Sequence, residues 1–230
     1  MAEQPQRQLS PAGRIFAAVT MMIVWFALIV QVIIAMPVFI GQGFSAFGAL
    51  VQTFCFFTMT TNALVAIYLA VVVFAPRSRD GQFFLRASVT AAVAKYIIFV
   101  SIIHTLLLRA GEDPEGWHWV TNNTLHLVVP VMFVIYWMVF APRERIPWHA
   151  TVLCLIYPIT YFIFTFIRGR VLGTYPYPLI DVNLHGYTSV IITATILTLV
   201  FWVFSLMIVG INRLLTQKLS PERASDISPG

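Results

Sequence analysis

Apolar residues along this chain form six long runs that are separated by short polar or charged segments. Each run is long enough to cross a bilayer, which takes about 20 residues at a rise of about 1.5 Å per residue. Hydrocarbon satisfies no exposed backbone polar group, so such runs must be helices, and their continuity disfavours a membrane β-barrel. The predicted spans are residues 14–36, 49–74, 86–107, 117–140, 148–167 and 186–213.

The predicted fold is therefore an all-α polytopic membrane protein with one six-helix transmembrane domain over residues 14–213. Residues 1–13 are expected to be a disordered cytoplasmic tail and residues 214–230 a cytoplasmic tail. Pro37 is expected to end the first span. Residues 38–48 are apolar but contain three glycines, and we expect a re-entrant or interfacial stretch there.

Composition supports a membrane protein, because 59% of the residues are hydrophobic and only 10% are charged. A soluble domain of this length needs more charge to cover its surface. The net charge of +5 could suggest nucleic acid in a soluble protein, but most basic residues here flank the spans, so no nucleic-acid partner is expected. The two cysteines lie inside apolar runs and indicate neither a disulfide framework nor a thiolate metal site.

The basic residues also predict the orientation of the spans. Ten of them lie in the two tails and in the loops that share their side, and three lie in the opposite loops. The positive-inside rule then places both termini in the cytoplasm of a multi-pass inner-membrane protein. The ten are Arg7, Arg14, Arg77, Arg79, Arg86, Arg143, Arg145, Arg213, Lys218 and Arg223.

Polar side chains inside the membrane are costly and mark candidate functional sites. The second span carries Thr58 and Asn62, and the fourth carries Asn122, Asn123 and His126. The threonine and the histidine each lie nine residues inside their predicted spans, which is roughly 13–14 Å below the outer boundary. Two groups at equal depth can meet if their helices are neighbours.

A hydroxyl and an imidazole in contact form a nucleophile and its general base. His126 would take the proton of Thr58 as the oxygen attacks a carbonyl, and the amides of Asn62, Asn122 or Asn123 would stabilise the oxyanion. No span contains an aspartate or glutamate to orient the imidazole. Alternatively, the threonine bonds to a carbonyl of its own helix, and the asparagines and histidine hold helices together.

Lys95 is the remaining lysine or arginine and lies in the interior of the third span, nine residues from its start. It could lie beneath the polar site and stabilise a carboxylate or an oxyanion, or it could extend its ammonium toward the cytoplasm. A small transporter that uses Lys95 and the polar helix faces is one alternative to an enzyme, although no repeat or broken helix pair supports it. A non-catalytic integral membrane protein is another.

Several of these residues resemble motifs of the androgen-induced gene family. The resemblance rests on Phe57-Thr58 with Thr61-Asn62, on Asn122 to His126 followed by Pro130, on Tyr177-Pro178-Leu179 and on Leu85-Arg86. Members of that family are six-helix threonine hydrolases that cleave fatty acid esters of hydroxy fatty acids. The resemblance implies that Thr58 is the nucleophile and His126 the base. The segment from Asp181 to Tyr187 is similar to bacterial six-helix relatives.

Cofactor binding is not expected from this sequence. His104 lies three residues from the outer end of its predicted span, whereas His126 lies nine residues inside its own, and this mismatch argues against a pair of axial haem ligands. A zinc site from His118, Asp181 and His185 has no ligand-spacing motif, so no metal is expected. The expected partners are the membrane and a lipid or fatty-acyl ester substrate.

Overall fold

The computed structural model describes residues 7–109 and 113–225. Within these residues, six helical segments are long and apolar enough to cross a membrane, and there is no strand, which confirms the predicted all-α polytopic fold. The six segments are Pro11–Gly41, Phe57–Phe74, Ala87–Leu108, Gly116–Phe140, Ala150–Leu172 and Val182–Leu214.

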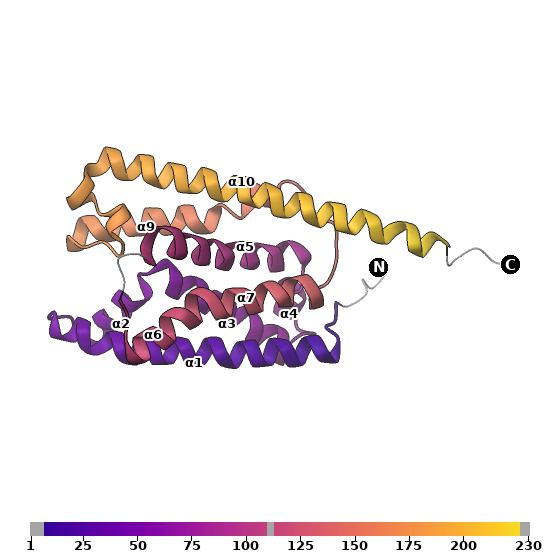
Figure 1. Ribbon diagram of the computed structural model, residues 1–230, viewed down its shortest axis with the longest axis horizontal. Helices are drawn as coiled ribbons and strands as arrows, with labels where there is room; N and C mark the ends of the chain where they lie inside the picture. Colours follow the sequence, from indigo (N-terminus) through magenta and orange to yellow (C-terminus); the bar gives the residue numbers. More distant parts are fainter. Residues whose placement is uncertain (1–6, 110–112, 226–230) are drawn as a thin grey trace. The chain divides into compact units, whose positions relative to one another are not determined.

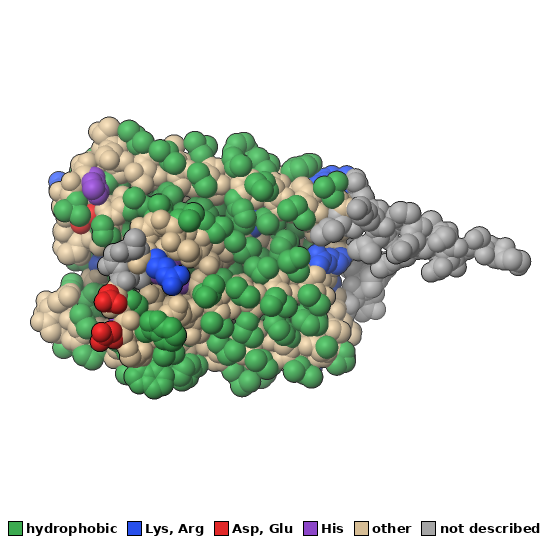
Figure 2. All heavy atoms as spheres, viewed as in Figure 1, with side chains coloured by type: hydrophobic (Ala, Val, Ile, Leu, Met, Phe, Trp, Pro, Cys, Tyr) green, Lys and Arg blue, Asp and Glu red, His purple; other side chains and the backbone are tan. Residues whose placement is uncertain are grey.

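Large apolar side chains remain exposed along these helices, as expected for helices in contact with lipid. On the first helix Ile15 is 67% exposed, Phe26 50% and Ile33 64%. Figure 2 shows hydrophobic side chains spread across the displayed face. Exposed apolar surface of this extent is typical of a membrane-facing or interaction surface.

The chain divides into two compact units, Met1–Pro142 (unit 1) and Arg143–Gly230 (unit 2), where the sequence predicted one domain over residues 14–213. Unit 1 contains four spans. Its helix α1 (Pro11–Gly41) packs against α3 (Phe57–Phe74) and α7 (Val129–Ile135), and α5 (Ala87–Ile103) also packs against both α3 and α7 (Figure 1). The four spans therefore close into a ring, which allows side chains from different helices to meet at its centre.

The start of unit 1 differs from the predicted boundaries. Helix α1 begins at Pro11, inside the expected N-terminal tail, because the Ser10 hydroxyl caps it by accepting a bond from the Gly13 N–H at 3.1 Å. Pro37 does not end α1, which continues to Gly41, as membrane helices often tolerate an internal proline. The expected interfacial stretch is thus the end of α1, a turn at Gly43 with φ of 93°, and α2 (Ala46–Phe54).

The predicted second span is broken into α2 and α3. The Thr53 hydroxyl donates to the Ala49 carbonyl at 2.9 Å, a kind of bond that bends helices, and Phe56 is extended with ψ of 133°. The first backbone bond of α3 runs from the Thr60 N–H to the Phe56 carbonyl at 3.1 Å. This break places Thr58 in the first turn of a helix.

Two π-helical segments carry the histidines of the third and fourth spans. His104 begins η1 (His104–Leu108), and His126 lies within η3 (Thr124–Val128), which links α6 (Gly116–Asn123) to α7. Pro130 has no N–H to offer the His126 carbonyl four residues earlier, which explains the wider turn in η3. Such segments often occur at functional sites.

Unit 2 is a helix pair joined by a folded loop. After α8 (Ala150–Leu153), α9 (Ile156–Leu172) ends at Gly173 with φ of 71°, and η5 (Pro178–Ile180) leads to α10 (Val182–Ser225), which is kinked at Gly186. The predicted cytoplasmic tail over residues 214–230 is therefore helical as far as Ser225, while its residues 226–230, like residues 1–6 of the first tail, lie outside the described residues.

Polar groups in unit 2 bond to one another. The Asn212 side-chain oxygen accepts from the Ile146 N–H at 3.1 Å, and the Cys154 thiol lies 3.2 Å from the Ser205 hydroxyl. All four residues are buried. These contacts join α10 to the segment before α8 and to the residue that follows α8, and they are of the kind that holds membrane helices together.

Candidate active site

Thr58 and His126 meet within unit 1. The Thr58 hydroxyl lies 3.1 Å from Nε2 of His126, although the two residues are 68 positions apart in the chain. Thr58 is 9% exposed, and His126 is partly buried. The proximity that equal depth predicted is therefore confirmed, and its structural cause is the packing of α3 against η3.

The second ring nitrogen of His126 determines the role of the first. Nδ1 lies 2.9 Å from the backbone carbonyl of Asn122. A carbonyl oxygen only accepts, so this contact assigns the proton to Nδ1. Nε2 then carries the lone pair and accepts the Thr58 hydroxyl. This is the tautomer that a general base needs, and a backbone carbonyl holds it in the place where a carboxylate often does.

Asn62 joins the two helices behind this pair. Its side-chain nitrogen donates to the Thr58 carbonyl at 2.9 Å and to the Leu125 carbonyl at 3.2 Å. Both amide protons are thus used, which corrects the expectation that Asn62 donates to an oxyanion. Turning the amide over would set its oxygen against two carbonyls, so its orientation is fixed. That oxygen is buried and accepts no bond from the described residues.

His104 stacks on His126, a contact that the sequence argument missed. The two ring centroids are 3.6 Å apart, the ring planes differ by 15°, and His104 is 7% exposed. The expected mismatch in depth between the two histidines was wrong. Each depth was counted from the end of its own span, but the fourth span, which begins near Gly116, extends about 9 Å beyond the end of η1 at a rise of about 1.5 Å per residue. Face-to-face stacking leaves no space for an iron between the rings, so the geometry does not support axial haem ligation.

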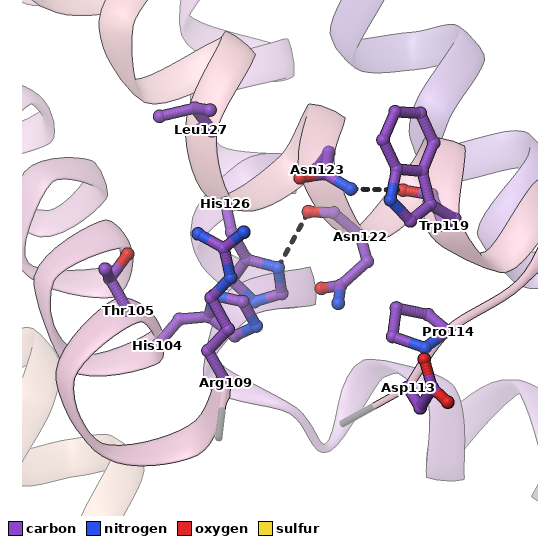
Figure 3. A pocket seen from close by; sticks show the side chains of 10 residues that line it. All are labelled: His104, Thr105, Arg109, Asp113, Pro114, Trp119, Asn122, Asn123, His126 and Leu127. Atoms are coloured by element: carbon purple, nitrogen blue, oxygen red, sulfur yellow. Dashed lines mark hydrogen bonds between the residues drawn. The ribbon is translucent and has the colours of Figure 1, made fainter. Parts of the chain in front are cut away.

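A cavity of about 230 Å³ opens beside the histidines. Figure 3 shows Arg109, His104 and His126 together on one side of it, with Asp113, Pro114 and Trp119 on the other. The predicted residues Asn122 and Asn123 also line it, and the Asn123 amide nitrogen donates to the Trp119 carbonyl at 2.9 Å. Thr58 does not line the cavity. It contacts His126, which does.

Lys95 is buried and lies outside the cavity lining, with only 1% of the residue exposed. Lys95 precedes His104 by nine residues on the third span, which separates them by roughly 13 Å along the helix axis. The structure therefore places Lys95 deeper in the bundle than the two histidines. This agrees with the predicted position beneath the polar site.

Among the described residues, no three of histidine, cysteine, aspartate and glutamate gather as metal ligands do. His118 and Glu115 are exposed residues near the start of α6 and do not line the cavity. The functional groups of the site are therefore a hydroxyl, two imidazoles, amides and the two charged residues Arg109 and Asp113.

Comparisons with known proteins give one distant similarity. The chain is 27% identical over 150 residues to "Uncharacterized protein MG452" of Mycoplasma genitalium. The aligned region covers 60% of this chain and 52% of that protein. The chain thus matches about half the length of that relative. No family model matches the sequence, and no solved structure matches it.

Proposed function

We propose that this protein is an intramembrane hydrolase of fatty-acyl ester lipids, acting in the cell inner membrane, with Thr58 as nucleophile and His126 as general base. Fatty acid esters of hydroxy fatty acids are one such substrate class, which the resemblance of the threonine and histidine motifs suggests. The observation that carries the proposal is the 3.1 Å contact between the Thr58 hydroxyl and Nε2 of an imidazole whose other nitrogen is already engaged.

In the first step, the Thr58 oxygen attacks the ester carbonyl carbon while its proton passes to Nε2 of His126. The tetrahedral intermediate then expels the alcohol, which takes the proton back from His126. An acyl group is left on Thr58. The Asn122 carbonyl accepts the Nδ1–H throughout and favours the charged imidazole that forms between the two transfers.

In the second step, water attacks the acyl-threonine and gives up a proton to His126. Collapse of this intermediate releases the fatty acid and returns the proton to the Thr58 oxygen. Both intermediates carry a negative oxygen that needs donors. The start of α3 favours negative charge through its helix dipole, and the amide of Asn122 lines the neighbouring cavity.

Substitution of Thr58 in the purified full-length protein tests the proposal. Thr58→Val keeps the shape and removes the hydroxyl, so kcat for ester cleavage should fall by at least about 10³-fold. Thr58→Ser keeps a hydroxyl and should retain measurable turnover. A fluorophosphonate probe should label the wild-type protein at Thr58, as shown by peptide mass spectrometry, and should not label Thr58→Val.

Two matched variants control for general damage. The Thr60 hydroxyl contacts the backbone carbonyls of Phe56 and Phe57 at the start of α3, and Thr60→Val should leave kcat unchanged. His118→Ala removes an exposed histidine of α6 and should do the same, whereas His126→Ala should abolish turnover. Ester cleavage that persists in Thr58→Val and His126→Ala, with both proteins folded, would contradict the proposal.

A further inference from the structure

The cavity beside His126 has opposite charges on its two sides. Arg109 lies with the histidines, and Asp113 lies across from it beside Pro114, on the same side as Trp119 (Figure 3). Both charged side chains are exposed, and neither forms an ion pair with another residue in the described part of the chain. With neutral histidines the formal charges of the described lining residues cancel. The cavity therefore presents a dipole and not a single sign of charge.

We propose that this cavity binds the zwitterionic head group of a glycerophospholipid, with its phosphate at Arg109 and its ammonium at Asp113 and Trp119. A guanidinium offers paired N–H donors that match phosphate oxygens. A carboxylate and the face of an indole both attract an ammonium group. An anionic lipid without the ammonium would leave Asp113 in the same cavity with no positive partner.

The size of the cavity fits this assignment. Its volume of about 230 Å³ is below the roughly 300–1,000 Å³ of sites that enclose a drug-sized ligand. It therefore holds a head group, while the acyl chains stay outside against the apolar helix surfaces. In a glycerophospholipid the ester groups connect these two parts, so a head group bound here brings an ester toward His126, which lines the same cavity.

This inference rests on the proposed hydrolase function and names its substrate class. Cleavage by Thr58 and His126 would then split one ester bond of the phospholipid with water, giving a lysophospholipid and a free fatty acid. The water supplies the hydroxyl of the acid and the proton of the released alcohol. No other reactant is needed.

Three lipids with identical acyl chains separate the contributions of the two charges. They are phosphatidylethanolamine, phosphatidylglycerol and diacylglycerol, offered to the full-length protein in nanodiscs of non-cleavable ether lipids. Wild-type protein should have the highest kcat/KM for phosphatidylethanolamine. Arg109→Gln should lower the ratio of phosphatidylethanolamine to diacylglycerol by about tenfold. Asp113→Asn should lower the ratio of phosphatidylethanolamine to phosphatidylglycerol by a similar factor.

Matched variants outside the cavity provide the control. Glu115→Gln removes an acidic residue two positions from Asp113 that does not line the cavity, and Arg170→Gln removes an exposed arginine at the end of α9. Both should keep the wild-type substrate ratios. Ratios that stay unchanged in Arg109→Gln and Asp113→Asn would overturn the inference, even if the protein hydrolyses all three esters.

A binding measurement separates this inference from the hydrolase proposal. The Thr58→Val protein should retain phosphatidylethanolamine over phosphatidylglycerol in native mass spectrometry, and Asp113→Asn in that background should remove the preference. If wild-type protein cleaves no ester but this binding pattern holds, the hydrolase proposal fails and the head-group site stands. If both lipids bind equally to Thr58→Val, the head-group site is wrong whatever the catalytic result.

Discussion

Helix α3 carries two buried polar clusters whose hydrogen bonds follow the same logic. At its start, Thr58 donates to His126, which donates to the Asn122 carbonyl. Ten residues later, the Tyr68 hydroxyl lies 2.9 Å from Thr90 and 3.3 Å from Tyr136. The Thr90 hydroxyl also contacts the carbonyls of Phe84 and Arg86, each at 3.2 Å, and a carbonyl only accepts. The protons therefore run from Tyr136 to Tyr68 to Thr90 to a carbonyl.

The two clusters differ in what surrounds them. Tyr68, Thr90 and Tyr136 are each 0% exposed, and every hydroxyl proton in that chain has an acceptor. The Thr58 cluster contains an imidazole that can gain a proton, and that imidazole lines a cavity. A closed chain of hydroxyls contributes to stability, whereas a chain with a base at an open cavity can support chemistry. Substitutions in the Tyr68 cluster should change the free energy of unfolding, and substitutions in the Thr58 cluster should change kcat.

The largest effect in this comparison is expected for His104. Its ring fixes the plane of His126 by stacking at 3.6 Å, so His104→Ala should lower kcat for ester cleavage by about 10²-fold through loss of alignment. His104→Phe keeps a stacked ring and should restore most of the activity. Kinetics and the unfolding temperature of both variants check this. If His104→Phe is as inactive as His104→Ala, then His104 acts by its nitrogens and not by positioning.

Substitution of Asn62 should lower kcat less than substitution of His104 does, and it should also lower the free energy of unfolding. Asn62 joins the Thr58 and Leu125 carbonyls, so Asn62→Leu removes a link between the helices that carry Thr58 and His126. We expect kcat to fall by about tenfold and the free energy of unfolding to fall by about 1–3 kcal/mol. Steady-state kinetics and SDS denaturation in mixed micelles measure the two changes. A loss of stability without any change in kcat would mean that Asn62 only packs the bundle.

The sequence was sufficient for the six spans and for the meeting of Thr58 with His126. Spans follow from the length of apolar runs, and the meeting followed from counting residues at a constant rise along two helices. The count worked because α3 and η3 are neighbours in the ring of four spans. Ring order is a property of packing, and nothing in the periodicity of one chain determines which spans touch.

The same counting gave the wrong depth for His104, and the sequence did not predict the break before α3. Depth counted from a helix end requires that both ends lie at the same level, but the fourth span extends past the third at the end where His104 lies. The break at Phe56 involves no proline or glycine, the residues from which sequence reasoning predicts an interruption. Pro130 was the one readable signal of irregular backbone near His126, since it removes a helix donor.

The smallest effects are expected in the closed cluster, where the direction of the hydroxyl protons gives an order of effects. Tyr68 both donates and accepts, so Tyr68→Phe should lower the free energy of unfolding by about 1–3 kcal/mol. Tyr136 only donates at the start of the chain, so Tyr136→Phe should cost less, about 1 kcal/mol. Both rings stay packed against Phe133, so no cavity is created. SDS denaturation gives the costs, and kcat should match wild type in both variants. An equal or reversed order of the two costs would contradict the assigned direction, and a fall in kcat would mean that the two clusters of α3 are coupled.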